Sequence, residues 1–173
     1  MTEIDYVTRV FPSPLEIDAR NWNALLANGL DPSPFMRHEY LVALHESGCA
    51  REQTGWQPQF VTLWRDKELH AACAMYLKNH SYGEYVFDWA WANAYAQHGL
   101  DYYPKALVAV PFTPVPGARL LARDGNARTA LVKALIARTR EEQLSSLHLL
   151  FAQAHDVEAC HAAVRAGADF VKT

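Results

Sequence analysis

Apolar residues recur at helical spacing in two runs near the start of the chain. The first run follows Ser13-Pro14, where an N-cap serine precedes a proline at the first helical position, and it ends at Gly29. The second follows Ser33-Pro34 and ends at Gly48. The pattern predicts two consecutive helices, whose apolar faces consist of Leu15, Ala19, Trp22, Leu26, Met36, Tyr40 and Leu44.

The pattern changes after Pro58 to short runs rich in aromatic, aliphatic and β-branched residues. Residues 59–64 and 69–77 form two such runs, separated by the polar residues 65–68, and they predict a β-hairpin. A proline-rich turn at 111–117 interrupts the later part of the chain. There we expect a helix at 89–97 capped by Asp88 and closed by Gly99, strands at 105–110 and 118–122, a helix at 127–143, a strand at 147–151, a helix at 156–166 and a strand at 169–172.

With a strand before the first helix, the order is strand, two helices, hairpin, helical excursion, strand, helix, strand, helix, strand. This order predicts a mixed α/β, or α+β, fold, and a length of 173 residues fits one domain without an internal linker. A last strand of only four residues would make a poor sheet edge. We therefore expect the fold to continue beyond Thr173.

Composition narrows the classes of partner. The net charge is −3 and the basic residues are scattered, so DNA and other nucleic acids are not predicted as purely electrostatic partners. Three widely separated cysteines, Cys49, Cys73 and Cys160, fit neither a disulfide framework nor a C-x-x-C site. No run approaches the ~20 apolar residues that span a bilayer. A cytoplasmic protein without a membrane span is expected.

Residues 78–91 combine a lysine, a histidine, two carboxylates and five aromatic rings. A core segment gains nothing from four titratable groups, and a solvated loop gains nothing from so many rings. The mixture therefore predicts the wall of a binding pocket. The rings are Tyr82, Tyr85, Phe87, Trp89 and Trp91.

Three residues of this stretch are candidates for catalysis. Glu84 or Asp88 would act as a general base for an attacking amine, with burial beside aromatic rings raising its pKa toward neutrality. The alternative for Asp88 is a cap of the helix at 89–97, and for Glu84 it is plain solvation. His80 would shuttle a proton or stabilise an oxyanion, and its alternative is a satisfied polar residue in a loop.

The candidates for substrate binding lie in and beyond the same stretch. Lys78, Lys105 and Arg119 would hold a phosphate or carboxylate, although a lysine at a strand end is often only solvated. Neighbours on a strand face opposite sides, so one of Tyr102 and Tyr103 is expected to pack in the core. The histidines show no metal-binding spacing, so no metal is predicted. The full set of binding candidates is Lys78, Tyr82, Trp89, Trp91, Tyr103, Lys105, Thr113 and Arg119.

The order of elements resembles the GNAT-type acyltransferase fold. Five sequence runs are more specific than this order: Gly55-Trp56-Gln57-Pro58, Tyr76-Leu77-Lys78, the stretch from His80 to Trp91, Tyr102-Tyr103-Pro104-Lys105, and the stretch from Ala109 to Leu120. Together they resemble the bacterial FemAB-like family over roughly residues 30–150. The resemblance implies a central mixed, mainly antiparallel sheet flanked by helices.

The family is similar to the FemABX aminoacyltransferases, which carry two GNAT-like domains in tandem and transfer an amino acid from aminoacyl-tRNA to an amine of a cell-wall precursor. The resemblance implies that this chain is the first of two such domains. Its donor would be aminoacyl-tRNA or an acyl-CoA. Residues 110–119, however, hold one glycine and three prolines where GNAT domains that use acetyl-CoA carry a glycine-rich phosphate cradle, which disfavours CoA.

Two functions are therefore expected from the sequence. The first is an N-acyl- or aminoacyltransferase-like domain that binds an amine-bearing acceptor such as a cell-wall precursor. The second is a non-catalytic recognition or structural half that needs a second GNAT-like domain to form an active site. The titratable groups of residues 78–91 favour the first, and the missing cradle favours the second.

Overall fold

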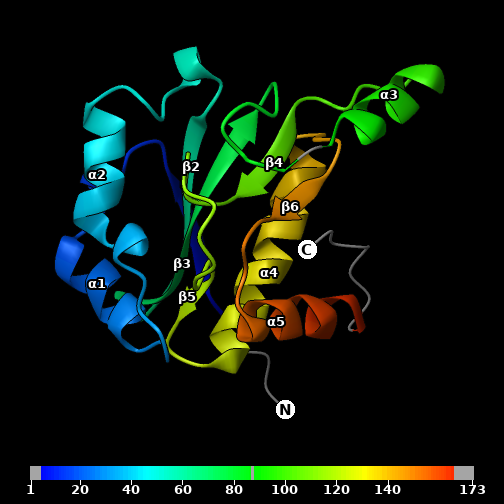
Figure 1. Ribbon diagram of the computed structural model, residues 1–173. Coiled ribbons are helices and arrows are strands. Elements are labelled where there is room, and N and C mark those ends of the chain that lie inside the picture. The colour runs from blue at the N-terminus through cyan, green and yellow to red at the C-terminus, as the bar shows by residue number, and fades with distance from the viewer. Residues whose placement is uncertain (1–4, 87, 166–173) are drawn as a thin grey trace.

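The computed structural model describes residues 5–86 and 88–165, which are built around a six-stranded sheet (Figure 1). The strand order is β1-β2-β3-β4-β6, with β5 beside β3, and only β4 and β6 are parallel. The predicted α+β class with a mainly antiparallel sheet is confirmed, and it is consistent with a GNAT-like fold. The strands are β1 (Val7–Phe11), β2 (Gln57–Arg65), β3 (Glu68–Lys78), β4 (Lys105–Val108), β5 (Leu121–Ala122) and β6 (Leu147–Leu149).

Helices cover both faces of the sheet (Figure 1). They are α1 (Ala19–Ala27), α2 (His38–Glu46), α3 (Trp89–Gln97), α4 (Gly125–Glu141) and α5 (Ala154–Arg165), with the 3₁₀ turns η1 (Pro14–Glu16), η2 (Pro34–Met36) and η3 (Glu52–Thr54). The prediction of α3 at 89–97 is confirmed. None of the helices within the described residues is long and apolar enough to cross a membrane.

The two predicted N-terminal helices exist, but their starts were placed too early. Ser13 and Ser33 cap the 3₁₀ turns η1 and η2 and accept from backbone N–H groups two residues on, at 3.2 and 3.3 Å. Helix α1 begins only after Asp18, whose carboxylate accepts from the N–H of Asn21 at 2.9 Å. The Ser-Pro motif thus specifies a single turn, because the chain then bends before each α-helix.

The alternation of side chains along β2 and β3 separates two cores. Val61, Leu63, Cys73 and Met75 face α4 and α5 in the first core. The intervening residues face α1 and α2 in the second core, where Phe60, Ala72, Ala74 and Tyr76 pack around Trp22. Cys73 is fully buried. The sheet is therefore the middle of three layers.

The chain from β4 to β5 pairs with β3 in two pieces. Val108 lies opposite Met75 and Leu121 lies opposite Ala72, so residues 109–120 form an excursion from the same edge of β3. The predicted strands at 105–110 and 118–122 are consequently shorter than expected, because the prolines of 111–117 carry the backbone away from the sheet. The predicted strand at 147–151 is likewise limited to 147–149, and that at 169–172 lies outside the described residues.

A buried carboxylate fixes the end of this excursion. Asp156 of α5 is 0% exposed and accepts from the N–H groups of Arg119, Leu120 and Gln153 at 2.8, 3.2 and 3.2 Å. The Arg119 guanidinium donates to the carbonyls of Leu150 and Val115 at 2.9 and 2.6 Å. The excursion is therefore held by bonds to its own backbone, to the segment after β6 and to α5.

We expect Asp156→Ala to lower the free energy of unfolding by about 3 kcal/mol, because three backbone N–H groups would lose their acceptor in a dry environment. Urea denaturation measures the change. Glu46→Ala, at an exposed position of α2, is the matched control and should stay within about 0.5 kcal/mol of the wild type. Equal losses in the two variants would contradict the assigned role of Asp156.

Candidate functional site

Two lysines lie opposite each other on adjacent strands. Lys78 at the end of β3 pairs in register with Lys105 at the start of β4, so both side chains lie on the same face of the sheet. Both residues are 0% exposed. Like charges directly opposite each other are destabilising, so the surroundings must supply negative charge.

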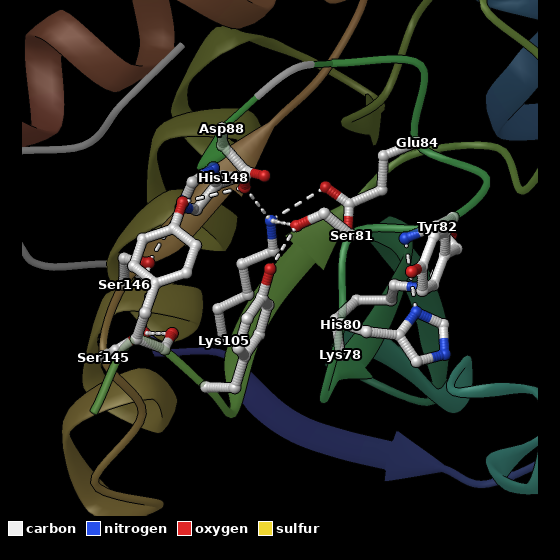
Figure 2. A network of polar contacts seen from close by, with 12 residues as sticks. Lys78, His80, Ser81, Tyr82, Glu84, Asp88, Lys105, Ser145, Ser146 and His148 are labelled. Carbon is white, nitrogen blue, oxygen red and sulfur yellow. Dashed lines mark hydrogen bonds and ion pairs between the residues drawn. The ribbon is translucent and has the colours of Figure 1, made fainter. Parts of the chain in front are cut away.

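The loop between β3 and α3 supplies that charge to Lys105 (Figure 2). The ammonium donates to Glu84 Oε2 at 2.8 Å, to Asp88 Oδ2 at 2.5 Å and to Ser81 Oγ at 3.0 Å. A lysine has three N–H donors, and these three acceptors occupy them. We call Lys105, Glu84, Asp88 and Ser81 the Lys105 network.

Both tyrosines that precede β4 join the Lys105 network. Tyr102 donates its hydroxyl to Asp88 Oδ2 at 2.9 Å, and the hydroxyl of Tyr103 lies 2.7 Å from Ser81 Oγ. Their ring centroids lie 5.3 and 5.7 Å from Lys105 Nζ. As expected, one of the two, Tyr102, packs in the core, whereas Tyr103 is only partly buried. The two rings nevertheless meet beside Lys105, because both residues lie before the strand begins.

His148 of β6, which is not among the residues predicted for the site, extends the network. His148 Nε2 lies 2.8 Å from Ser146 Oγ and 3.5 Å from the Tyr102 hydroxyl (Figure 2). His148 is buried and lies opposite Leu107 in the parallel pair of strands. A polar residue between two leucines of a short buried strand was the one available signal.

Lys78 occupies a different environment from Lys105. Its Nζ lies 3.7 Å from the ring centroid of Trp56 and donates to the carbonyl of Tyr82 at 3.2 Å. Burial lowers the pKa of Lys78 to about 8; Glu84 acts against this and Lys105 adds to it. Lys78 also lines a pocket of about 140 Å³ together with Gly55, Gln57 and Pro104.

The pKa values of the two carboxyl groups, Glu84 and Asp88, are shifted in opposite directions. Burial raises the pKa of Glu84 above its ordinary value, although Lys105 and Lys78 act against the shift. Burial also opposes ionisation of Asp88, but bonds from Lys105, Ser81 and Tyr102 outweigh it, and the pKa of Asp88 is lowered. Two carboxyl groups with separated pKa values are typical of an acid and base pair. Glu84 is the one that binds a proton more readily.

One oxygen of each carboxylate is unused. Glu84 Oε1 and Asp88 Oδ1 are buried and have no hydrogen-bond partner within the described part of the chain. Asp88 occupies the N-cap position of α3, yet its side chain makes no cap hydrogen bond. The interpretation of Asp88 as a helix cap is therefore wrong, because its carboxylate turns to Lys105.

The aromatic candidates do not close over the network. Tyr82 is 67% exposed, and Trp89 and Trp91 are each 54% exposed. The two tryptophans belong to α3, which buries none of its residues and projects from one end of the molecule (Figure 1). These rings therefore form an exposed surface beside the Lys105 network.

The remaining candidates lie apart from Lys105. His80 packs against Gly55, accepts from the N–H of Tyr82 at 3.2 Å, and has a pKa lowered by burial and by Lys78. Thr113 Oγ1 lies 3.1 Å from the Tyr40 hydroxyl and donates to Pro111 O at 3.0 Å. Arg119 binds the backbone carbonyls of Val115 and Leu150, as described above. The structure thus brings together Lys78, Glu84, Asp88, Tyr103 and Lys105 but not Thr113 and Arg119.

We expect Lys105→Met to lower the free energy of unfolding by about 3–5 kcal/mol, because it removes the ammonium group that both buried carboxylates bind. Adding Glu84→Gln and Asp88→Asn to this variant should recover a large part of the loss. Chemical denaturation of the single and triple variants measures both effects. A triple variant less stable than Lys105→Met would contradict the assigned charge balance.

A second prediction concerns pH. Between pH 8 and 10.5 the unfolded chain keeps the proton of Lys78 and the folded chain releases it, so this lysine makes stability rise with pH. Relative to Lys78→Met, the wild type should gain up to about 3 kcal/mol over this window. Urea denaturation at a series of pH values measures the difference. Parallel curves for the two proteins would refute the lowered pKa.

Comparison with known proteins agrees with the resemblance carried by the sequence. Neither a curated protein nor a solved structure matches the chain. The model of the FemAB-like family, described as peptidoglycan biosynthesis/recognition, matches residues 13–171. This match includes every strand from β2 onward and all residues of the Lys105 network. The chain therefore belongs to the FemAB-like family of peptidoglycan biosynthesis/recognition proteins.

Proposed function

We propose that the chain is an N-acyl- or aminoacyltransferase-type domain that binds an amine-bearing cell-wall precursor. Membership of the FemAB-like family supports a role related to peptidoglycan. The observation that carries the chemistry is Glu84, a buried carboxyl group with a raised pKa and an unused oxygen, Oε1. Such a group can receive a proton from an amine.

Amine acylation has a proton balance that these residues can serve. The acceptor nitrogen bonds to the acyl carbon of an ester or thioester donor and loses a proton to Glu84. The bond to the leaving group breaks, and Glu84 returns the proton to that group. Lys105 stays charged throughout and holds Glu84 in place through the bond of 2.8 Å.

Access to Glu84 requires the loop over it to move. Glu84 is only 3% exposed, and the described residues of the segment 79–88 contain no helix or strand. The pocket beside Lys78 lies next to this segment and includes Asn79. We propose that the acceptor amine enters from this pocket when the loop shifts.

The backbone of the excursion at residues 109–120 bears on which acyl donor the chain would bind. Pro111, Pro114 and Pro116 carry no N–H group, so they cannot donate to a pyrophosphate. Gly117 donates its N–H to the carbonyl of Phe151 at 3.0 Å instead. We therefore favour aminoacyl-tRNA over an acyl-CoA as the donor.

A second candidate function is recognition without catalysis, and burial favours it. Lys105, Glu84 and Asp88 are at most 3% exposed, and all three donors of Lys105 are occupied. In this case the Lys105 network only stabilises the loop between β3 and α3. A second GNAT-like domain of the same protein would then complete any active site. Location in the cytoplasm is a prediction in both cases.

The test measures transfer from aminoacyl-tRNA to a muropeptide by this chain and by a two-domain form. We expect Glu84→Gln to lower kcat by about 10²-fold or more without a matching rise in KM, because it removes the base but keeps the shape. Glu46→Gln is the matched exposed control and should have no effect.

Full activity of Glu84→Gln in whichever form transfers would overturn the assignment of the base. Saturable binding of the muropeptide without transfer by either form would replace the transferase proposal with recognition. Absence of both binding and transfer would overturn both candidate functions.

A further inference from the structure

A larger pocket lies where the pairing of β1 with β2 ends. The last pair of these strands is Phe11 with Phe60, and Pro12 then leads the chain away. Residues 57–59 of β2 therefore extend past the end of β1. The hollow beside them has a volume of about 630 Å³, which is in the range of sites for small molecules.

Two arginines from different elements line this pocket. Arg138 of α4 donates through Nε to Gln59 Oε1 at 2.8 Å and through Nη2 to Glu142 at 2.7 Å, which orients its guanidinium. Arg51 donates through Nε to the carbonyl of His45 at 2.8 Å. No carboxylate of the described residues lies within 4.0 Å of Arg51, so its terminal amino groups are available to an anion.

The other lining groups suit a peptide better than a polyphosphate. Gln57 and Gln59 offer amide groups, and Val10, Pro12 and Pro58 offer small apolar surfaces. Glu52 also lines the pocket, and its negative charge favours an ammonium group and disfavours a multiply charged phosphate. A short peptide with small side chains, whose ends carry an ammonium group and a carboxylate, matches this combination of charges.

His45 adds a polar group that the fold leaves unused. Its Nε2 lies 3.2 Å from Ser13 Oγ, while its Nδ1 is buried without a partner among the described residues. The Ser13 hydroxyl already accepts from the N–H of Leu15, so its own proton is available to Nε2. In that arrangement Nδ1 carries a proton and is an unused buried donor of a residue that lines the pocket.

We propose that this pocket binds the carboxylate end of a short peptide, with Arg51 and Arg138 on the carboxylate and Gln57 and Gln59 on the peptide groups. The site shares Glu52 and Gln57 with the smaller pocket beside Lys78. A peptide held here extends toward Lys78. The inference does not rest on the proposed acyl transfer, since binding alone is required.

The test is an NMR titration of the whole chain with the dipeptide Ala-Ala, its C-terminal amide and inorganic phosphate, following the side-chain Nε–Hε signals of the arginines. We expect saturable shifts at Arg51 and Arg138 with Ala-Ala. The amide should bind at least about tenfold more weakly, because it lacks the carboxylate.

Arg51→Gln and Arg138→Gln should each weaken binding of Ala-Ala by about fivefold or more. Arg65→Gln is the matched control, because Arg65 lies at the other end of β2 and pairs with Asp66 on the surface. Arg51 makes only one side-chain hydrogen bond, so its variant tests the site even if Arg138→Gln disturbs the fold.

Equal affinity for the dipeptide and its amide would overturn the proposal, as would wild-type affinity in Arg51→Gln. Phosphate binding as tight as dipeptide binding would reduce the pocket to a general anion site and would also overturn it. Absence of saturable shifts with Ala-Ala would mean that the pocket binds no such ligand. Loss of acyl transfer with dipeptide binding intact would affect only the proposed function.

Discussion

The opposition of Lys78 and Lys105 across β3 and β4 is the constraint on which the rest of this end of the molecule depends. Two ammonium groups on one face of a sheet, both removed from water, repel each other unless anions lie close by. Glu84 and Asp88 provide these anions from a loop rather than from the sheet. The pairing of the strands thereby determines where the loop must lie, and the four charges balance within a dry space.

The loop is then held at more than one point. Lys78 donates to the carbonyl of Tyr82, and the carbonyl of Gly83 accepts from the N–H of Phe112 at 3.2 Å. Gly83 has φ of +80°, and a Cβ there would lie 2.5 Å from the Phe112 ring, so only glycine fits without strain. The loop over the lysines and the excursion at 109–120 are therefore coupled.

Regular patterns in the sequence predicted the layers but not the side-chain network. Alternation in β2 and β3 and the helical spacing in α4 depend on neighbours along the chain, so the class of fold and most elements were predictable. Which oxygens approach Lys105 depends on a loop without periodicity, and Asp88 at a helix start fitted a cap equally well. The roles of Asp156 and His148 were not predictable, because each side chain links segments more than thirty residues apart in sequence: Asp156 binds the backbone of Arg119 and Leu120, and His148 approaches Tyr102.

The free-energy cost of burying the charged groups of the Lys105 network helps to decide whether their role is only structural. Burying ions is expensive, and apolar residues of similar volume often stabilise a protein as well as a buried ion pair does. A structural role alone therefore gives little reason for two lysines and two carboxylates to be enclosed together. The opposite pKa shifts of Glu84 and Asp88 and their unused oxygens are properties that the proposed proton transfer would use and that a purely structural network would not need. We therefore favour the proposed acyltransferase-type role over recognition alone. Proton transfer would make use of buried charged groups, whereas recognition alone would give no reason for their unfavourable burial.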